Sequence, residues 1–384
     1  MEIAPGIKYI GVNDHQIDLF EGQYEVPNGM AYNSYAVIDE KTAIFDTVDE
    51  NFVSQWLENI EKALAGKTPD YLIVQHMEPD HSAGIAVFME KYPSAQIVAS
   101  AKAFPIIKNF HGTDFADRRI IAAEGTTLSL GGRTLTFITA PMVHWPEVIV
   151  TYDDRTKTLF SADAFGKFGA LDSDEDWACE ARRYYMGIVG KYGAQVQALL
   201  KKASALQIET VCPLHGPVLS GDDLAIALEK YDIWSSYRPE NEGVTIAYAS
   251  IYGHTKDAAL ELAKQLEEKG VKVSCFDLAR DDVAEAVEDS FRYDRLVLAS
   301  STYNNGLFPF MQTFIHALTE RNFQNRTVAF IENGSWAPAA AKNMKALLEN
   351  SKNLTFAETV VTLRSALSDE SRASLAALAY ELVK

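Results

Sequence analysis

Short apolar runs follow one another closely in the first half of the chain. Between residues 32 and 152 only a few polar or turn residues separate them, which is typical of β-strands. The predicted strands are 35–38, 42–45, 71–75, 96–99, 133–139 and 148–152. This density indicates stacked sheets. Strands at 158–162 and 210–213 and helices at 195–205 and 222–234 extend the same domain.

The second half alternates regularly between strand-like and helix-like segments. The predicted order is strand 244–248, helix 256–268, strand 272–276, helix 283–289, strand 296–299, helix 311–320, strand 328–331, helix 339–349, strand 358–362 and a final helix. Strict alternation indicates a parallel sheet with helices on both faces. Such sheets bind ligands at the carboxyl ends of their strands.

The two patterns meet in a polar segment, residues 235–243, which contains Pro239 and Gly243. A chain of 384 residues is also too long for one ordinary core. We therefore predict an α/β protein with one domain at residues 1–240 and a second at residues 241–384.

Composition and charge disfavour several classes of protein. No apolar run approaches the roughly 18 residues that a membrane-spanning helix needs, and the N-terminus lacks the basic start and apolar run of a secretory signal. A formal net charge of -18 makes nucleic acid an improbable partner. The three cysteines include no Cys-x-x-Cys pair for zinc, an iron–sulfur cluster or a rubredoxin-type iron. We expect a cytoplasmic protein, not bound to a membrane, whose electron donor is another molecule.

The strongest local signal is the segment 76–81, His-Met-Glu-Pro-Asp-His, directly after a predicted strand. Its potential metal ligands are His76, Glu78, Asp80 and His81. Strand ends are where a rigid sheet can direct side chains into one pocket. Two imidazoles and two carboxylates packed so closely would stay unpaired unless water or a metal ion satisfied them. The segment therefore predicts a metal site.

Three further candidates, His144, Asp163 and His215, each follow a predicted strand. Each also has an ordinary explanation. A single His after a strand is more often a surface or hydrogen-bonded core residue, and Asp163 could simply cap the next segment. Taken singly, none of the three predicts a metal site.

This arrangement resembles the metallo-β-lactamase superfamily, whose signature is His-x-His-x-Asp-His followed by distant His, Asp and His ligands. Here Glu78 replaces the second His, which gives the His-x-Glu-x-Asp-His pattern of the flavodiiron proteins. Three carboxylates offset much of the charge of two divalent ions, and a mixed imidazole and carboxylate shell suits iron. The pattern favours a diiron centre over a dizinc centre.

The resemblance also implies a role for each ligand. One iron would be held by His76, Glu78 and His144 and the other by Asp80, His81 and His215, with Asp163 as the bridge. Residues 160–166, Phe-Ser-Ala-Asp-Ala-Phe-Gly, resemble the bridging segment of the family. The second His of the first motif is not always bound to iron in this family, so ligation by His81 stays open.

Polar loops follow three predicted strands of the second domain. The first leads into a helix whose N-terminus, together with loop N–H groups and hydroxyls, could hold a phosphate. The other two add polar groups and aromatic rings that could contact a flavin. The candidate residues are Ser250, Ile251, Tyr252, Gly253, His254, Thr255, Thr302, Tyr303, Asn304, Asn305, Gly306, Gly334, Ser335 and Trp336. Alternatively, Ser250 and Thr255 are ordinary helix caps, and Tyr303 and Trp336 are only rim aromatics.

The second domain resembles flavodoxin over its length, and residues 302–309 are close to the run found in flavodiiron proteins. The resemblance implies a metallo-β-lactamase-like αββα sandwich followed by a flavodoxin-like doubly wound parallel sheet that binds FMN. The loop 334–338, Gly-Ser-Trp-Ala-Pro, departs from the more usual Gly-Ser-Tyr-Gly-Trp pattern of the family.

The combined resemblance implies a flavodiiron oxidoreductase that reduces dioxygen to water, nitric oxide to nitrous oxide, or both. FMN would pass on electrons from an external donor such as rubredoxin or reduced deazaflavin. The family also implies a head-to-tail homodimer or a dimer of dimers. Two other classes stay open. One is a dizinc hydrolase fused to a flavodoxin, which stoichiometric zinc without iron would favour, and the other is a non-enzymatic electron carrier or redox sensor.

Overall fold

Two β-sheets lie at the centre of the first unit of the computed structural model, which describes residues 1–384. Contacts among its elements assign Met1–Tyr185 and Ala194–Asp232 to this unit. The first sheet has the order β1-β2-β7-β8-β9-β10-β11. Its strands are β1 (Glu2–Ala4), β2 (Ile7–Tyr9), β7 (Tyr35–Ile38), β8 (Thr42–Phe45), β9 (Tyr71–Val74), β10 (Gln96–Ala99) and β11 (Arg119–Ile121). Strands β8 to β11 are parallel, so their carboxyl ends share one edge.

The second sheet has the order β12-β13-β14-β15-β16-β17. Its strands are β12 (Thr127–Ser129), β13 (Thr134–Thr139), β14 (Ile149–Asp153), β15 (Thr158–Phe160), β16 (Thr210–Cys212) and β17 (Leu219–Ser220). Strands β15 and β16 are parallel, so the segments that follow them leave at the same edge. Two short antiparallel pairs lie outside these sheets: β3 (Val12–Asp14) with β6 (Met30–Tyr32), and β4 (Leu19–Phe20) with β5 (Tyr24–Glu25).

The two sheets pack face to face through alternate residues of their strands. Tyr35 and Val37 of β7 and Phe45 of β8 share one buried cluster with Phe137 and Phe160 of the second sheet. Side chains two residues apart on a strand point to the same face, which puts Tyr35 and Val37 in the core together. The rings of Phe45 and Phe160 stack with their centroids 4.0 Å apart.

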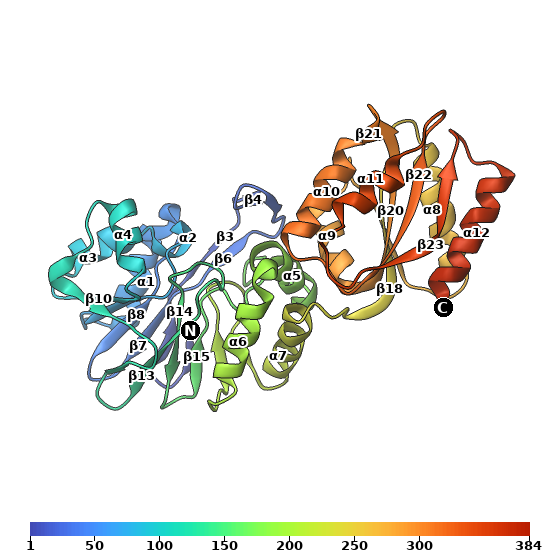
Figure 1. Ribbon diagram of the computed structural model, residues 1–384. Helices are drawn as coiled ribbons and strands as arrows, with labels where there is room; N and C mark the ends of the chain where they lie inside the picture. Colours follow the sequence, from blue (N-terminus) through green and yellow to red (C-terminus); the bar gives the residue numbers. More distant parts are fainter. The chain divides into compact units, whose positions relative to one another are not determined.

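Helices cover the outer faces of both sheets. Figure 1 shows α1, α3 and α4 beside the first sheet and α6 and α7 beside the second. The helices are α1 (Val53–Leu64), α2 (Pro79–Ser82), α3 (Ile85–Lys91), α4 (Ala103–His111), α5 (Trp177–Tyr184), α6 (Gly193–Ala203) and α7 (Gly221–Ser235). The predicted αββα sandwich is confirmed.

Helices α1 to α5 are absent from the sequence prediction. Helix α1 has a pattern that could have revealed it, because its buried residues Val53, Trp56, Ile60 and Leu64 recur at intervals of three or four and form one face. The helix ends where Ala65 takes a left-handed conformation, with φ of 48°.

A parallel sheet of five strands forms the centre of the second unit, Met186–Gly193 and Ile233–Lys384. The order is β19-β18-β20-β22-β23. The strands are β18 (Asn241–Ala249), β19 (Val273–Asp277), β20 (Tyr293–Tyr303), β22 (Thr327–Asn333) and β23 (Thr355–Leu363), and β21 (Gly306–Leu307) pairs with the end of β20. The chain adds β19 on one side of β18 and all later strands on the other side, so the strand order changes direction between β18 and β20. Sheets of this kind bind ligands at the carboxyl ends of the strands next to that point.

Helices cover both faces of this sheet, so the doubly wound architecture is confirmed. Helices α8 (His254–Glu267) and α12 (Asp369–Val383) share one core with it. Helices α9 (Val283–Arg292), α10 (Pro309–Glu320) and α11 (Ala340–Leu347) lie on the opposite face (Figure 1).

The predicted boundary between residues 240 and 241 stays a prediction. Strand β18 begins inside the polar segment that was expected to be a linker, because Asn241 pairs with Tyr293. The segment 186–193 belongs by its contacts to the second unit, where Arg321 donates from Nε to the carbonyl of Met186 over 2.9 Å. None of the helices has the length and apolar character needed to cross a lipid bilayer.

Candidate metal centre and ligand cavity

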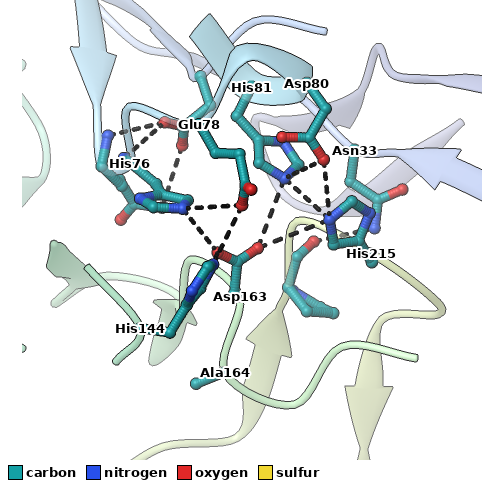
Figure 2. Close-up of polar contacts among 12 residues, drawn as sticks. Asn33, His76, Glu78, Asp80, His81, His144, Asp163, Ala164 and His215 are labelled. Carbon is teal, nitrogen blue, oxygen red and sulfur yellow. Dashed lines mark hydrogen bonds and ion pairs between the residues drawn. The ribbon is translucent and has the colours of Figure 1, made fainter. Parts of the chain in front are cut away.

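The segment 76–81 turns sharply just beyond the end of β9. Glu78 is the N-cap of the short helix α2, and Pro79 stands in its first turn, where a missing N–H breaks no helical hydrogen bond. This turn separates the four side chains into two pairs. In Figure 2, His76 and Glu78 point toward one group of ligands, and Asp80 and His81 point toward another.

The first group contains His76, Glu78, His144 and Asp163, whose ligand atoms all lie within 4.8 Å of one another. The Glu78 carboxylate is 3.1 Å from Nε2 of His144 and 3.4 Å from Nε2 of His76. These side chains come from the ends of different strands, so the fold of the sandwich assembles the group.

The second group contains Asp80, His81 and His215, again with all ligand atoms within 4.8 Å. The Nε2 atoms of His81 and His215 face each other at 2.9 Å. The Asp80 carboxylate is 3.2 Å from the first of these atoms and 3.3 Å from the second. Nitrogen atoms that converge in this way are suited to share one cation.

Asp163 lies between the two groups. Its Oδ2 atom is 3.1 Å from His76 and 3.4 Å from His144, whereas its Oδ1 atom is 3.4 Å from His81 and 3.6 Å from His215. Each carboxylate oxygen therefore faces a different group, as a bridging ligand requires.

The loop around Asp163 is strained. The neighbouring Ala162 and Phe165 have φ angles of 51° and 70°, in the left-handed region that residues with a side chain rarely adopt. The hydroxyl of Ser161 donates to the Ala164 carbonyl over 2.7 Å, which helps to hold this turn. Strain that the surroundings maintain in this way is a common feature of functional sites.

The buried carboxylates of the centre stabilise positive charge on the groups around them. Burial alone would lower the pKa of His144, but Asp163 and Glu78 raise it to about 9. Burial would raise the pKa of Asp163, but His76, His144 and His81 hold it well below its usual range. Buried carboxylates that favour cations so strongly are suited to divalent metal ions.

Buried oxygen atoms in the centre also lack hydrogen-bond donors. Both carboxylate oxygens of Asp80 and both of Asp163 are buried without a hydrogen bond of normal geometry, although imidazole nitrogens lie within ion-pair distance. Such atoms need a partner, and a metal ion would provide one. All seven predicted ligands are therefore brought together, and their binding to metal stays a prediction.

Two carboxylates that the sequence analysis missed support His76. Glu147 is buried and accepts a hydrogen bond from Nδ1 of His76 over 2.8 Å. Asp46, also buried, accepts from the backbone N–H groups of Gln75 at 2.7 Å and His76 at 3.3 Å. Asp46 directly follows β8, as the predicted metal ligands follow other strands. This position in the sequence could have marked it as a candidate site residue.

The backbone around β6 supports His215. Nδ1 of His215 donates to the carbonyl of Ala31 over 2.7 Å. The buried side-chain amide of Asn33 donates to the carbonyls of Pro213 and Gly216 over 2.9 and 2.7 Å. These bonds fix the loop that carries His215, and no local sequence pattern marks them.

Aromatic rings surround the second group. The ring centroids of Phe20, Tyr184 and Tyr32 lie 5.3, 5.5 and 6.1 Å from that of His215. His215 is only 1% exposed, whereas one carboxylate of each group is partly exposed, Glu78 by 16% and Asp80 by 11%. Solvent thus reaches both groups at their carboxylates, Glu78 and Asp80.

A cavity of about 680 Å³ opens at the carboxyl ends of the strands of the second unit. The residues that line it are Ser250, Ile251, Tyr252, His254, Thr255, Ser301, Thr302, Tyr303, Asn304, Asn305, Asn333, Gly334, Ser335, Trp336, Ala337 and Ser365. The three predicted loops therefore converge on one cavity, although Gly253 and Gly306 do not line it. Ser301, Asn333, Ala337 and Ser365 were not predicted.

A polar network ties these loops together beneath the cavity. The buried Asn333 side chain donates to the Ser365 carbonyl over 2.9 Å and accepts from the Ser365 N–H at 3.1 Å. The Thr255 hydroxyl lies 3.0 Å from that of Ser301. The loop after β23 thus forms part of the cavity wall, and its short polar sequence gave no sign of this.

The rim of the cavity exposes large aromatic side chains. Tyr252 is 91% exposed, Trp336 is 86% exposed and Tyr303 is 44% exposed. The rings of Tyr252 and Trp336 are little covered by their own unit and are free to contact a ligand or a partner. The predicted contact of Trp336 with a flavin stays a prediction.

Comparisons with known proteins agree with both halves of this description. The ODP family beta lactamase model matches residues 30–216, and the flavodoxin model matches residues 246–372. The nitric oxide reductase of Moorella thermoacetica is 30% identical to this chain over 373 residues, 94% of this chain and 92% of that protein.

Solved structures match the whole chain. The rubredoxin oxygen:oxidoreductase of Desulfovibrio gigas has a TM-score of 0.92 and 26% identity, with 100% of this chain and 97% of that chain covered. The flavodiiron protein of Giardia intestinalis has a TM-score of 0.92 and 25% identity, with 100% and 96% covered. Because relatives match in both domains, in the same order and over nearly the full length, this chain belongs to the flavodiiron protein family.

Proposed function

We propose that this protein is a flavodiiron oxidoreductase that reduces dioxygen to water, nitric oxide to nitrous oxide, or both. The observation that carries the proposal is the position of Asp163, which joins two imidazole and carboxylate groups in a chain that also has a flavodoxin cavity. The similarity to a nitric oxide reductase and to a rubredoxin oxygen:oxidoreductase supports both gases as substrates.

The two groups fit two iron ions in their donor chemistry. His76, Glu78 and His144 would hold one ion, Asp80, His81 and His215 would hold the other, and Asp163 would bridge them. The bound ions would supply electrons and Lewis acidity to the gas. Three carboxylates balance much of the charge of two divalent ions, and a mixed imidazole and carboxylate shell suits iron.

The protein around the centre controls access. The rings of Phe20, Tyr32 and Tyr184 exclude water from the side of His215. The carboxylates of Glu78 and Asp80 are 16% and 11% exposed, so we expect the gas and protons to enter beside these two side chains.

The cavity of the second unit would hold FMN. The hydroxyls of Ser250 and Thr255 and the N-terminus of α8 would bind its phosphate, and the rings of Tyr303 and Trp336 would lie beside the flavin. FMN would receive electrons from a separate donor, rubredoxin or reduced deazaflavin. The three cysteines form no disulfide, which fits the cytoplasm.

We also expect a head-to-tail homodimer or a dimer of dimers. The exposed Tyr252 and Trp336 beside the cavity offer an apolar rim for a second copy of the chain. If the flavin of one subunit serves the metal centre of the other, mixing an FMN-deficient variant with an Asp163→Asn variant should restore part of the activity.

The proposal is tested by anaerobic assay of protein loaded with iron and FMN, with a chemical reductant and controlled addition of each gas. We expect at least one of the two gases to be consumed faster than by metal-stripped protein. If neither gas were consumed, the proposal would be overturned. Metal analysis accompanies the assay, because stoichiometric zinc without iron would favour a hydrolase.

A further inference from the structure

The two metal groups have the same donors but different surroundings. Each offers two imidazoles, one carboxylate of its own and one oxygen of Asp163. With equal donor sets, any difference in metal affinity must come from the residues around the ligands. The inference that follows rests on the proposed metal centre.

His76 of the first group is supported by a buried anion. Its Nδ1 atom lies 2.8 Å from Oε1 of Glu147, and both side chains are fully buried. The backbone N–H of Met77 donates to the same oxygen over 3.0 Å, which fixes the position of the carboxylate. A carboxylate that accepts from the far nitrogen of a metal-binding imidazole orients the ring and makes it a more basic ligand.

The second group has weaker support. His215 donates from Nδ1 to the Ala31 carbonyl, a neutral acceptor, over 2.7 Å. The Nδ1 atom of His81 is buried and has no hydrogen-bond partner. No carboxylate in this group has the role that Glu147 has beside His76.

We infer that Glu147 is a positioning residue that makes the His76–Glu78–His144 group the tighter metal site. One metal ion per chain then occupies this group, and the second ion binds more weakly at Asp80, His81 and His215. The two sites are filled in order, and a chelator removes the second ion first.

The direct test uses the wild-type protein. Crystals of metal-free protein supplied with one equivalent of Co²⁺ are measured by anomalous diffraction. The peak is expected between His76, Glu78 and His144. Equal peaks in both groups, or a single peak beside His215, would overturn the inference.

Variants test the cause. Metal-free protein is titrated with Co²⁺ against a competing chelator, and the two binding steps are followed by the visible absorption of the ion. Glu147→Gln keeps the shape and an acceptor oxygen but removes the charge, so the affinity of the first step should fall by about 10- to 100-fold. Asn33→Ala, which loosens the loop of His215, should weaken the second step instead. An unchanged first step in Glu147→Gln would contradict the role of Glu147.

Circular dichroism and bound FMN identify any variant that fails to fold, and the diffraction measurement needs no variant. The outcomes also separate this inference from the proposed function. Ordered binding without reduction of either gas would overturn only the proposed function. Gas reduction by protein whose two sites fill equally would overturn only the inference.

Discussion

The Oδ2 atom of Asp163 lies 3.1 Å from Nε2 of His76, and both side chains are buried. The other oxygen of the same carboxylate faces the second group of ligands. Asp163→Asn keeps the size of the side chain but replaces one charged oxygen with an amide that cannot bridge. We expect the iron content to fall from two ions per chain toward one. Gas reduction should fall at least about 100-fold, the upper end of the loss seen when a residue that only supports a metal ligand is replaced.

Iron content by elemental analysis and gas consumption check this prediction. Asp172→Asn is the matched control, because the Asp172 side chain is 62% exposed and pairs only with the exposed His15. If Asp163→Asn retained two ions and full activity, the bridging role would be wrong.

The segment 76–81 was predictable because four potential ligands stand together after one strand-like run, whereas His144, Asp163 and His215 were named as ligands only through the resemblance to the flavodiiron proteins. All of these residues follow strand-like runs, and a sheet places the ends of its strands together. Glu147 was not predicted, although it is as buried as the ligands. Its importance depends on His76, 71 residues away in sequence, and only tertiary structure brings the two together.

Local sequence patterns also decide which parts of the fold could be predicted. In the second unit every predicted strand is present, because strand and helix alternate and the apolar strands, such as 244–248, are bounded by turn residues. The amphipathic helix α1 was missed, since it lies among closely spaced strands. The contribution of Ser365 was missed because it depends on a pair of hydrogen bonds with Asn333 across two neighbouring strand ends.

Metal-free protein should lose stability as the pH rises. Burial lowers the pKa of His144, but Asp163 and Glu78 outweigh it and raise the value from 6.5 to about 9. The protonated form is therefore favoured in the folded state. Its stabilisation is complete below about pH 6.5 and is lost as the pH rises through 9, by at most about 3 kcal/mol.

Thermal unfolding between pH 6 and 10 checks this effect. Metal-loaded protein is the comparison, because bound metal requires neutral imidazoles and releases their protons. It should show a smaller loss of stability over the same range. A metal-free protein that became more stable between pH 7 and 9.5 would contradict the sign of the shift.

Trp336→Ala should weaken FMN binding without destabilising the fold. The side chain is 86% exposed, and surface substitutions usually change stability by less than about 0.5 kcal/mol. An aromatic contact contributes about 0.5–1.5 kcal/mol, so the dissociation constant should rise about 2- to 12-fold. Quenching of flavin fluorescence measures it. Tyr380→Ala is the control, since Tyr380 is 63% exposed and does not line the cavity.

Arg326 should be one of the strongest contributors to the stability of the second unit. It is 2% exposed, and its guanidinium donates to the carbonyls of Tyr237 at 2.8 Å, Gln324 and Asn325 at 3.1 Å, and Phe291. Arg326→Met fills similar volume but leaves these buried carbonyls with fewer donors. Each unsatisfied buried group costs about 1–3 kcal/mol, and Tyr237 keeps a second donor in the Asn325 side chain, so with two carbonyls left without a donor the total loss should be about 2–6 kcal/mol.

This loss is measured by unfolding the protein in urea. The release of bound FMN serves as the signal, because it reports on the unit that contains Arg326. Lys264→Met provides the control, because the Lys264 side chain is 70% exposed and its partner Glu268 is 64% exposed. The control should shift the midpoint little, while Arg326→Met shifts it to clearly lower urea. Equal midpoints for the two variants would mean that water replaces the lost donors, and that this arginine is not needed to satisfy the carbonyls around it.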